Sequence, residues 1–302
     1  MSLLVVGSMA LDSVKTPFGE REDAVGGSAT YFSASASFFT PLRLVAVVGA
    51  DFPESALEFL AGRKVDLAGL ERSEGKTFRW KGSYDFDLNT AHTLDTQLNV
   101  FERFRPQVPD AYRESEYIFL ANIDPGLQAL VLDQVKAPRL VACDTMNFWI
   151  EGKRKELAET LRRVDMLIIN EGEARELAGE ANILRAARKV REMGPKTLII
   201  KRGEYGALLF EGDSLFSAPG LPLEDIYDPT GAGDTFAGGF MGYLASTNNL
   251  AHDSLRRAVI FGSVMASFNV ESFSFDRLER LTYPEIEARY RVFSDLARFE
   301  PL

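Results

Sequence analysis

The hydrophobic pattern of this chain alternates between short apolar runs and amphipathic segments. Apolar runs typical of strands buried on both faces lie at 3–6, 44–48, 117–121, 140–143, 166–169 and 197–200. Patterns with helical spacing lie at 29–39, 53–60, 126–135, 153–162, 183–193, 235–244, 255–269 and 284–298. This rhythm predicts an α/β fold, a three-layer α/β/α sandwich with a mostly parallel central sheet.

The segment at about 75–104 departs from this rhythm. Polar and aromatic residues alternate at 77–84 and again at 97–102, which is typical of strands with one solvated face. We expect a small antiparallel β-lid here, with 13–24 as a second candidate part of it. An exposed face carrying Phe78, Trp80 and Tyr84 favours a homodimer through this lid. Since no linker or repeat divides the chain, residues 1–302 are expected to form a single domain.

A glycine-rich stretch, DPTGAGDT at 228–235, joins a strand-like run at 206–216 to the helical pattern that follows. The first N–H groups of a helix have no intrahelical partner, and the peptide dipoles add up there, so this loop predicts an anion site. Asp234 lies at the same place, where a carboxylate suits a base that deprotonates a group attacking the anion. We therefore predict phosphoryl transfer to a hydroxyl: the amides of Gly231, Ala232 and Gly233 meet the developing charge, and Asp234 accepts the proton.

The composition excludes several classes of protein but does not identify a substrate. The chain has 302 residues, 46% of them hydrophobic, and a formal net charge of -10, which argues against a nucleic-acid binder. A single cysteine, Cys143, excludes an intramolecular disulfide. The apolar start lacks the basic flank and cleavage site of a signal peptide, and no apolar stretch approaches a membrane span. A cytoplasmic protein without membrane partners is the expectation.

Polar residues follow most of the predicted strands: Asp12, Asn122, Asp124, Asp144, Asn147, Asn170 and Glu173. Each alone is as well explained as a turn or helix-cap residue. Their accumulation at one sheet edge favours a site, because α/β sheets bind ligands beyond the carboxyl ends of their strands. Asp12, Asn122 and Asp124 are candidates for binding the acceptor. Mg²⁺ would be held mainly by nucleotide phosphates and water, with Glu173 or Asn170 in an outer shell.

Two further segments are candidates for the nucleotide side of the site. The turn from Gly203 to Gly206 is either a simple hairpin or a backbone surface that lies against a nucleotide. In the helical pattern at 255–269, Ser263 and Ser267 are small enough to leave room for a flat ring.

Other chemistries find little support in the residues. With only His92 and His252, a histidine-rich metal site or a Ser-His-Asp triad is hard to build. The stretch GLERSEGKT at 69–77 resembles a Walker A loop but has one residue too many and leads into a strand pattern. A dinucleotide-dependent oxidoreductase is weakly supported, because GSMA, and not GxGxxG, follows the first strand.

The motifs together resemble one family. DPTGAGDTF at 228–236 closely resembles the second signature of the ribokinase-like PfkB carbohydrate kinases. Asn170 and Glu173 resemble the family's Asn-x-x-Glu motif near Mg²⁺ and the phosphates. Gly203 and Gly206 match the family's nucleotide-side glycine turn, and Gly26 and Gly27 match its sugar-binding diglycine. Asp12 matches the aspartate that binds the sugar, and Gly49 and Asp51 match its Gly-x-Asp element. The order of the motifs covers nearly the whole chain.

The resemblance implies ATP, Mg²⁺ and transfer to a primary hydroxymethyl group of a sugar. It also implies a nucleotide-side role for Thr230 and a monovalent cation such as K⁺ near Asp228. The chain departs from the family at Tyr31, where an Asn usually contacts the sugar, and at Lys201, a residue expected on the nucleotide side, where Thr is more usual. A Glu expected of ribokinases is absent from 120–125. These departures leave room for a nucleoside or modified sugar as acceptor, or for a catalytically idle ligand sensor.

Overall fold

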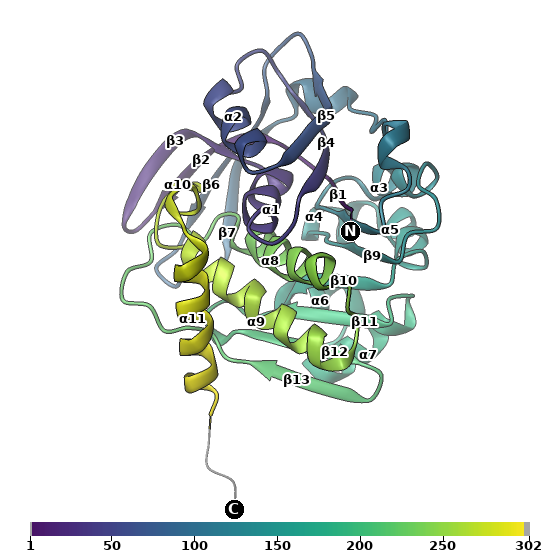
Figure 1. Ribbon diagram of the computed structural model, residues 1–302, viewed down its shortest axis with the longest axis vertical. Coiled ribbons are helices and arrows are strands. Elements are labelled where there is room, and N and C mark those ends of the chain that lie inside the picture. The colour runs from purple at the N-terminus through teal and green to yellow at the C-terminus, as the bar shows by residue number, and fades with distance from the viewer. Residues whose placement is uncertain (1, 299–302) are drawn as a thin grey trace, which may run out of the picture.

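The larger sheet of this protein has nine strands and forms the middle layer (Figure 1). The computed structural model describes residues 2–298. The strands lie in the order β13-β12-β11-β10-β9-β8-β1-β4-β5. Their bounds are β1 Leu3–Val6, β4 Leu42–Val48, β5 Val65–Arg72, β8 Tyr117–Leu120, β9 Leu140–Cys143, β10 Met166–Asn170, β11 Thr197–Lys201, β12 Ala207–Glu211 and β13 Ser214–Ala218.

All neighbouring pairs from β11 to β5 are parallel, whereas β12 and β13 pair antiparallel at one edge. The mostly parallel sheet confirms the prediction. The single strand expected at 206–216 is wrong, because Gly212, with φ of 51°, turns the chain back between β12 and β13. A positive φ costs glycine little, so this one residue divides an otherwise continuous apolar run into a hairpin.

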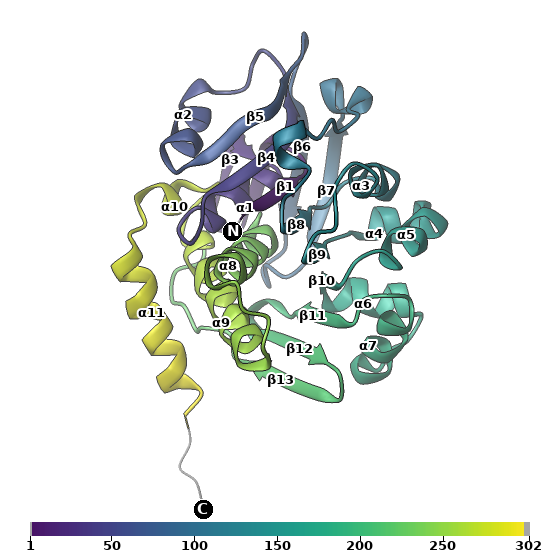
Figure 2. The same ribbon diagram turned by 45° about the vertical axis from the view of Figure 1, so that its right-hand side comes forward.

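Helices cover both faces of the sheet (Figure 2). Alternate residues of each strand point to opposite faces, so Leu3 and Val5 belong to one hydrophobic core while Leu4 and Val6 belong to the other. The first core is covered by α1 Ser28–Ala36, α2 Glu54–Gly62, α8 Ala232–Thr247, α9 His252–Asn269, α10 Asp276–Arg280 and α11 Tyr283–Leu296. The second is covered by α3 Pro125–Leu132, α4 Asn147–Gly152, α5 Arg154–Leu161, α6 Glu171–Ala178 and α7 Ile183–Glu192. The three-layer prediction is confirmed.

The lid is a second sheet with the strand order β3-β2-β6-β7. It consists of β2 Ala10–Thr16, β3 Gly19–Gly26, β6 Phe78–Tyr84 and β7 Ala91–Gln97. Its hairpins β2–β3 and β6–β7 are antiparallel, and β2 and β6 join them as a parallel pair. The second candidate part, at 13–24, therefore does belong to the lid.

Two local expectations near the lid are wrong. The alternating pattern at 97–102 is not a strand, because β7 ends at Gln97 and the 3₁₀-helix η1 Asn99–Arg103 follows. Its aromatic residue Phe101 instead stacks on Phe78, with ring centroids 5.4 Å apart. Asp12 lies within β2 and not in a loop after the first strand. Two more 3₁₀-helices are η2 Asp110–Tyr112 and η3 Gly203–Tyr205.

Helix α8 is held closely between α1 and α9. A Cβ atom on Gly238 would lie 2.4 Å from the carbonyl oxygen of Phe32 in α1. On the other side, a Cβ on Gly239 would lie 2.8 Å from the carbonyl oxygen of Phe261 in α9. Glycine is thus required on two faces of this helix, and the backbones approach to distances that a larger residue would prevent.

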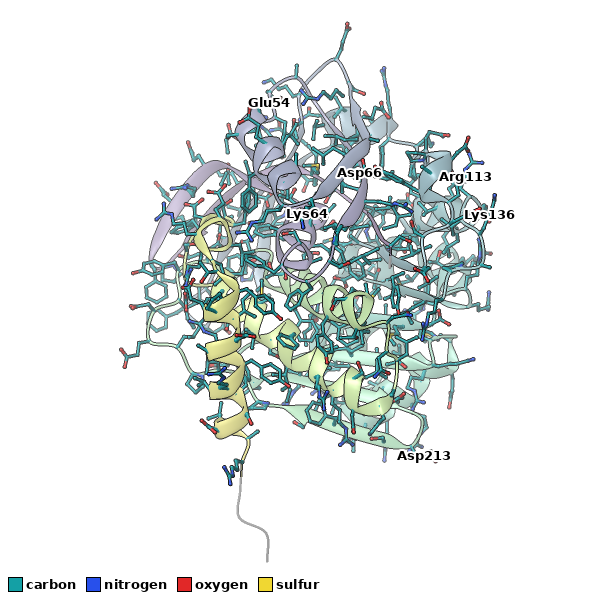
Figure 3. The ribbon with its side chains drawn as sticks, in the orientation of Figure 1. Glu54, Lys64, Asp66, Arg113, Lys136 and Asp213 are labelled. Carbon is teal, nitrogen blue, oxygen red and sulfur yellow. The ribbon has the colours of Figure 1, made fainter. Side chains whose placement is uncertain are left out.

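Charged side chains such as Glu54, Asp66 and Asp213 lie at the periphery of the molecule (Figure 3). Within residues 2–298, none of the helices has the length and apolar character needed to cross a bilayer.

Candidate active site

The DPTGAGDT stretch forms the turn into α8, as the sequence predicts, with Gly231 as the N-cap residue at φ of 74°. The Ala232 amide donates to the Pro229 carbonyl at 3.1 Å. Among the described residues, the amides of Gly231 and Gly233 have no hydrogen-bond partner. These two N–H groups are therefore available to an anion at the positive end of a 16-residue helix.

Asp234 lies in the first turn of α8, beside these amides. Its Oδ1 atom is buried and has no hydrogen-bond partner within residues 2–298. A buried carboxylate oxygen without a partner is costly, which indicates that a ligand donates to it. Burial, followed by the charge of Asp144, raises the pKa of Asp234 to about 7. A carboxyl group with this pKa is an effective general base near neutral pH.

Three strand exits bring a charged cluster beside Asp234. Asp144 follows β9, Asn170 ends β10 and Lys201 ends β11, and these strands are neighbours in the sheet. The Lys201 Nζ lies 3.3 Å from Asp144 Oδ2. A Cβ on Gly233 would lie 2.7 Å from the same Nζ, so the ammonium group lies against the first turn of α8. Burial opposes the charged form of Lys201, but Asp144, Glu173 and Asp234 outweigh it and raise its pKa.

Asn170 and Glu173 form a reciprocal capping box at the start of α6. The Asn170 side chain accepts from the Glu173 amide at 2.8 Å, and the Glu173 carboxylate accepts from the Asn170 amide, also at 2.8 Å. These bonds hold Glu173 in a buried position toward the charged cluster. Burial, with Asp144 as the next cause, raises the pKa of Glu173 to about 8. Among the described residues, no group of three His, Cys, Asp or Glu side chains is arranged to hold a metal ion.

The predicted acceptor residues Asp12, Gly26 and Gly27 come together where the lid meets α1. Asp12 is buried, and its carboxylate accepts from the Gly27 amide at 3.3 Å. A Cβ on Gly26 would lie 1.9 Å from Asp12 Oδ2, so any larger residue there would displace this carboxylate. Burial raises the pKa of Asp12 to about 7, against the effect of the Gly27 amide, and Asp228 and Asp234 add to the increase.

Tyr31 joins the acceptor side to the anion site. It is buried in α1, and a Cβ on Gly231 would lie 2.4 Å from its ring. Burial, and then Asp12, raise the pKa of the Tyr31 hydroxyl well above its usual value. The residue that replaces the family's Asn therefore packs directly on the loop that begins α8.

The lid reaches the same loop through Tyr84. Its hydroxyl accepts from Thr230 Oγ1 at 3.3 Å. Trp80 pairs with Asp12 in the parallel register of β6 and β2, so both side chains leave the lid on one face. The Trp80 ring lies over Gly82, and its Nε1 donates to Thr93. The exposed face expected for Phe78, Trp80 and Tyr84 is wrong: all three are partly buried.

Hydrogen bonds from α9 and from the segment that follows it hold the remaining predicted residues of the central motif, Asp228 and Thr230. Asp228 is buried and accepts from the amides of Thr230, at 2.8 Å, and Ser274, at 3.4 Å. Asn269, at the end of α9, donates to the Thr230 carbonyl at 2.8 Å and accepts from Thr235 Oγ1 at 3.1 Å. This buried amide fixes both ends of the turn.

On the nucleotide side, Gly203 and Gly206 form the turn between β11 and β12, with φ of 55° and 87°. A Cβ on Gly203 would lie 2.5 Å from Asn89 Oδ1, so the loop at the lid tip lies against this turn. Ser263 is partly exposed on α9. Ser267 is buried, donates to the Val264 carbonyl at 2.7 Å and accepts from Arg289 of α11 at 3.2 Å. The nucleotide roles of these four residues stay predictions.

Asn122 and Asp124 are engaged with the opposite helical layer. Asn122 accepts from Trp149 Nε1 at 3.0 Å, while Asp124 caps α3 and pairs with Lys153 at 2.5 Å. These contacts give both side chains a structural role, and the binding of the acceptor by Asn122 and Asp124 stays a prediction. The sequence analysis gave no particular role to Asp144 or Asn269 and expected Tyr84 on an exposed face. The strand-exit position was the available signal for Asp144.

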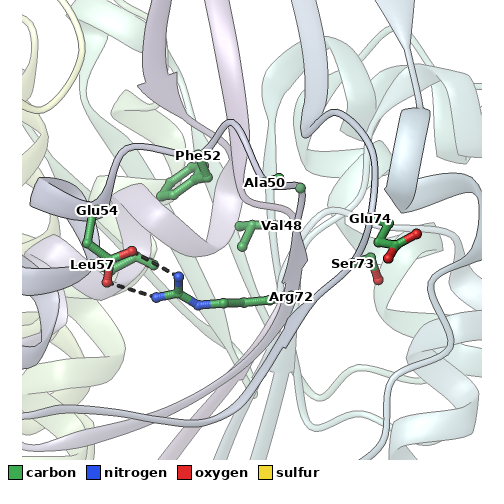
Figure 4. Close-up of a pocket in the computed structure, with 9 residues that line it drawn as sticks. Val48, Ala50, Phe52, Glu54, Leu57, Arg72, Ser73 and Glu74 are labelled. Atoms are coloured by element: carbon green, nitrogen blue, oxygen red, sulfur yellow. Dashed lines mark hydrogen bonds and ion pairs between the residues drawn. The ribbon is translucent and has the colours of Figure 1, made fainter.

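A separate cavity of about 380 Å³ opens beyond the end of β4 (Figure 4). Arg72 closes one side through two hydrogen bonds of 2.9 Å to Glu54. Of its nine lining residues only Gly49 belongs to a motif matched in the sequence, and none comes from the α8 turn or the lid strands. The cavity therefore shares no lining residue with the cluster around Asp234.

Comparison with known proteins decides the family. The family model described as pfkB family carbohydrate kinase matches residues 5–277. The chain belongs to this family. A cytidine kinase from Thermococcus kodakarensis is 31% identical over 247 residues, covering 80% of this chain and 87% of the relative. A ribokinase from Lactococcus lactis is 34% identical over 276 residues, covering 85% and 87%.

The fold comparison agrees with the family assignment. The crystal structure of an aminoimidazole riboside kinase from Salmonella enterica, with aminoimidazole riboside and an ATP analogue, aligns with a TM-score of 0.75. It is 20% identical and covers 97% of this chain and 99% of the relative. As a pfkB family member, the chain is a kinase that transfers a phosphoryl group to a hydroxyl of a sugar or nucleoside.

Proposed function

We propose that this pfkB family kinase transfers the γ-phosphoryl group of ATP to the hydroxymethyl group of a nucleoside, with a free sugar as the second candidate. Asp234 acts as the base and the Gly231–Gly233 loop as the anion hole. The observation that carries the proposal is the buried, unpartnered Asp234 Oδ1 beside the free amides of Gly231 and Gly233. An acceptor hydroxyl between them would satisfy the orphaned oxygen and face the phosphoryl group.

The surrounding charges fit a magnesium nucleotide. Bound Mg²⁺ would supply charge neutralisation at the phosphates, with Glu173 and Asn170 in its outer shell. The free amides receive charge on the equatorial oxygens, and Asp234 takes the acceptor proton. A positioned base typically contributes about 10²–10⁴ in rate. Asp12 and the Gly27 backbone orient the acceptor, and this positioning can supply a larger share of the barrier reduction, about 7–11 kcal/mol.

Asp234→Asn tests the chemistry. The amide keeps the shape of the side chain but cannot accept the proton, so kcat should fall about 10²–10⁴-fold. ATP affinity, measured calorimetrically without acceptor, should stay within about twofold, since the base faces the acceptor. The exposed Asp213→Asn is the matched control. Near-normal turnover by Asp234→Asn would refute the proposed mechanism.

The aromatic face of the lid favours a nucleoside over a free sugar. Trp80 leaves β6 on the same face as Asp12, and Tyr84 reaches Thr230. The indole ring, which lies over Gly82, offers a flat surface on the lid face from which Asp12 also leaves. Stacking of a base on an aromatic ring is worth about 1–3 kcal/mol. The cytidine kinase and aminoimidazole riboside kinase relatives support an acceptor that carries a base, whereas the ribokinase relative supports the free sugar.

An acceptor screen with ADP release as readout separates these candidates. We expect turnover with at least one nucleoside and a loss of about 5–150-fold in kcat/KM in Trp80→Ala, the kinetic equivalent of the stacking energy. Trp80→Phe should recover most of it. Turnover of free ribose alone, unaffected by Trp80→Ala, would select the sugar kinase. Ligand binding without turnover of any acceptor would favour the idle sensor.

We also propose a homodimer through the lid, now based on β7. Every residue of this edge strand is exposed, including Leu94 at 59%, and Phe86 nearby is 83% exposed. An exposed edge strand with apolar side chains is a template for pairing. Analytical ultracentrifugation that finds only monomers would remove this proposal. We propose as well that the chain forms a single domain and that the protein is cytoplasmic. A K⁺ ion near Asp228 is the last part of the proposal.

A further inference from the structure

Lys201 is an unusual residue for its position. It is the last residue of β11 and pairs in register with Asn170 of the capping box. Its side chain is only 16% exposed, and its Nζ contacts Asp144 at 3.3 Å. The same Nζ would lie 2.7 Å from a Cβ on Gly233, beside one of the two free amides of the anion site.

This placement is stabilised by the nearby carboxylates, which outweigh two effects that oppose it. The N-terminus of a helix carries partial positive charge, and an ammonium group there is repelled by it. Removing a lysine from water adds a further cost, which Asp144 and the nearby carboxylates must offset. Two sources of positive charge, the ammonium and the helix terminus, point to one place beside the unpartnered Asp234 Oδ1. A highly charged anion at that place would relieve the repulsion.

We infer that Lys201 is a catalytic residue whose ammonium group contacts the transferred γ-phosphoryl group. The inference rests on the proposed function and adds a residue to it. In the step, the bond from the acceptor oxygen to the γ-phosphorus forms and the bond to the β,γ-bridging oxygen breaks. The acceptor proton goes to Asp234, ADP leaves, and Lys201 stays protonated throughout. Asp144 holds the ammonium group in place when no nucleotide is bound.

Nucleotide binding without acceptor gives a readout that does not depend on turnover. Lys201→Met keeps the length of the side chain and removes the charge. Because the contact is to the terminal phosphate, ATP affinity should fall at least tenfold in this variant while AMP affinity stays within about twofold. Lys196→Met is the control, since Lys196 is exposed at the other end of β11. The same variant should lose about 10²–10³-fold in kcat, the usual effect of removing one donor from an anion hole.

Chemical rescue and a second variant keep the inference falsifiable. Lys201→Ala should recover part of its kcat with added ethylammonium but not with tetramethylammonium, which has no N–H donor. Asp144→Asn should keep the preference for ATP over AMP, because it leaves the ammonium group intact. An equal loss of ATP and AMP affinity in Lys201→Met, or no loss of either, would overturn the role of Lys201. Wild-type turnover in the acceptor screen decides the proposed function separately.

Discussion

Gly231→Ala should destabilise the protein through two effects that a matched control separates. Gly231 has φ of 74°, where a residue with a Cβ pays about 1–2 kcal/mol. Its new Cβ would also lie 2.4 Å from the buried ring of Tyr31, and overpacking of this kind costs about 1–3 kcal/mol. The sum, about 2–5 kcal/mol, is a large part of the stability of an ordinary domain.

Gly212→Ala isolates the backbone effect. Gly212 has φ of 51°, and a Cβ there would meet nothing within 4 Å. Urea unfolding should therefore show a loss of about 1–2 kcal/mol in Gly212→Ala and a clearly larger loss in Gly231→Ala. Only Gly231→Ala should lose activity, because displacement of the loop moves the free amides. A fall in kcat of about 10²-fold or more is expected.

A double-mutant cycle with Tyr31→Ala tests the steric cause directly. If the ring is the obstacle, the cost of Gly231→Ala should be about 1–3 kcal/mol smaller when Tyr31 is already truncated. Equal losses in Gly231→Ala and Gly212→Ala, with strict additivity in the cycle, would refute the reasoning. That result would mean that Tyr31 moves aside without cost.

Two further predictions concern the buried acid and the lid. Burial raises the pKa of Asp12 to about 7, so the folded state binds this proton more tightly than the unfolded state, and stability falls as pH rises from about 4 to 7. Asp12→Asn should therefore be more stable than wild type at pH 8 in thermal unfolding, and a constant difference down to pH 4 would contradict this. Asp51 accepts from the Thr77 amide at 2.7 Å and from Arg79 at 3.1 Å at the base of the lid. Asp51→Ala should raise the acceptor KM several-fold with nucleotide affinity unchanged, whereas Glu54→Ala, which breaks an exposed ion pair, should leave both unchanged.

The sequence was most informative where function depends on local geometry. The glycines at the start of α8, the carboxylate beside them and the buried strands follow from short-range rules of backbone conformation and periodicity. Which strands pair across long sequence separations could not be predicted from such short-range rules. Trp80 lies on the same face of the lid as Asp12 because β6 pairs with β2, 68 positions away by the register of these two residues. Likewise, Lys201 meets Asp144 only because β10 places their strands on its two sides.

Prediction from local sequence patterns was wrong where one pattern of apolar and polar residues is compatible with two conformations. Alternation at 97–102 fits a strand, but Phe101 finds its burial against Phe78 in a 3₁₀-helix. The apolar run at 206–216 contains one permissive residue, Gly212, and reverses there. At 97–102 a tertiary contact decides between conformations that the sequence alone leaves close in energy, whereas at Gly212 the backbone freedom of glycine decides.

The tight seating of α8 between α1 and α9 has an evolutionary consequence. Because Gly238 and Gly239 admit no larger side chain, the helix that carries Asp234 has little freedom to tilt or shift. In the proposed function the acceptor lies against other elements, among them the lid strands β2 and β6. Under this proposal, substitutions in those strands would change which molecule is phosphorylated while Asp234 keeps its place in α8.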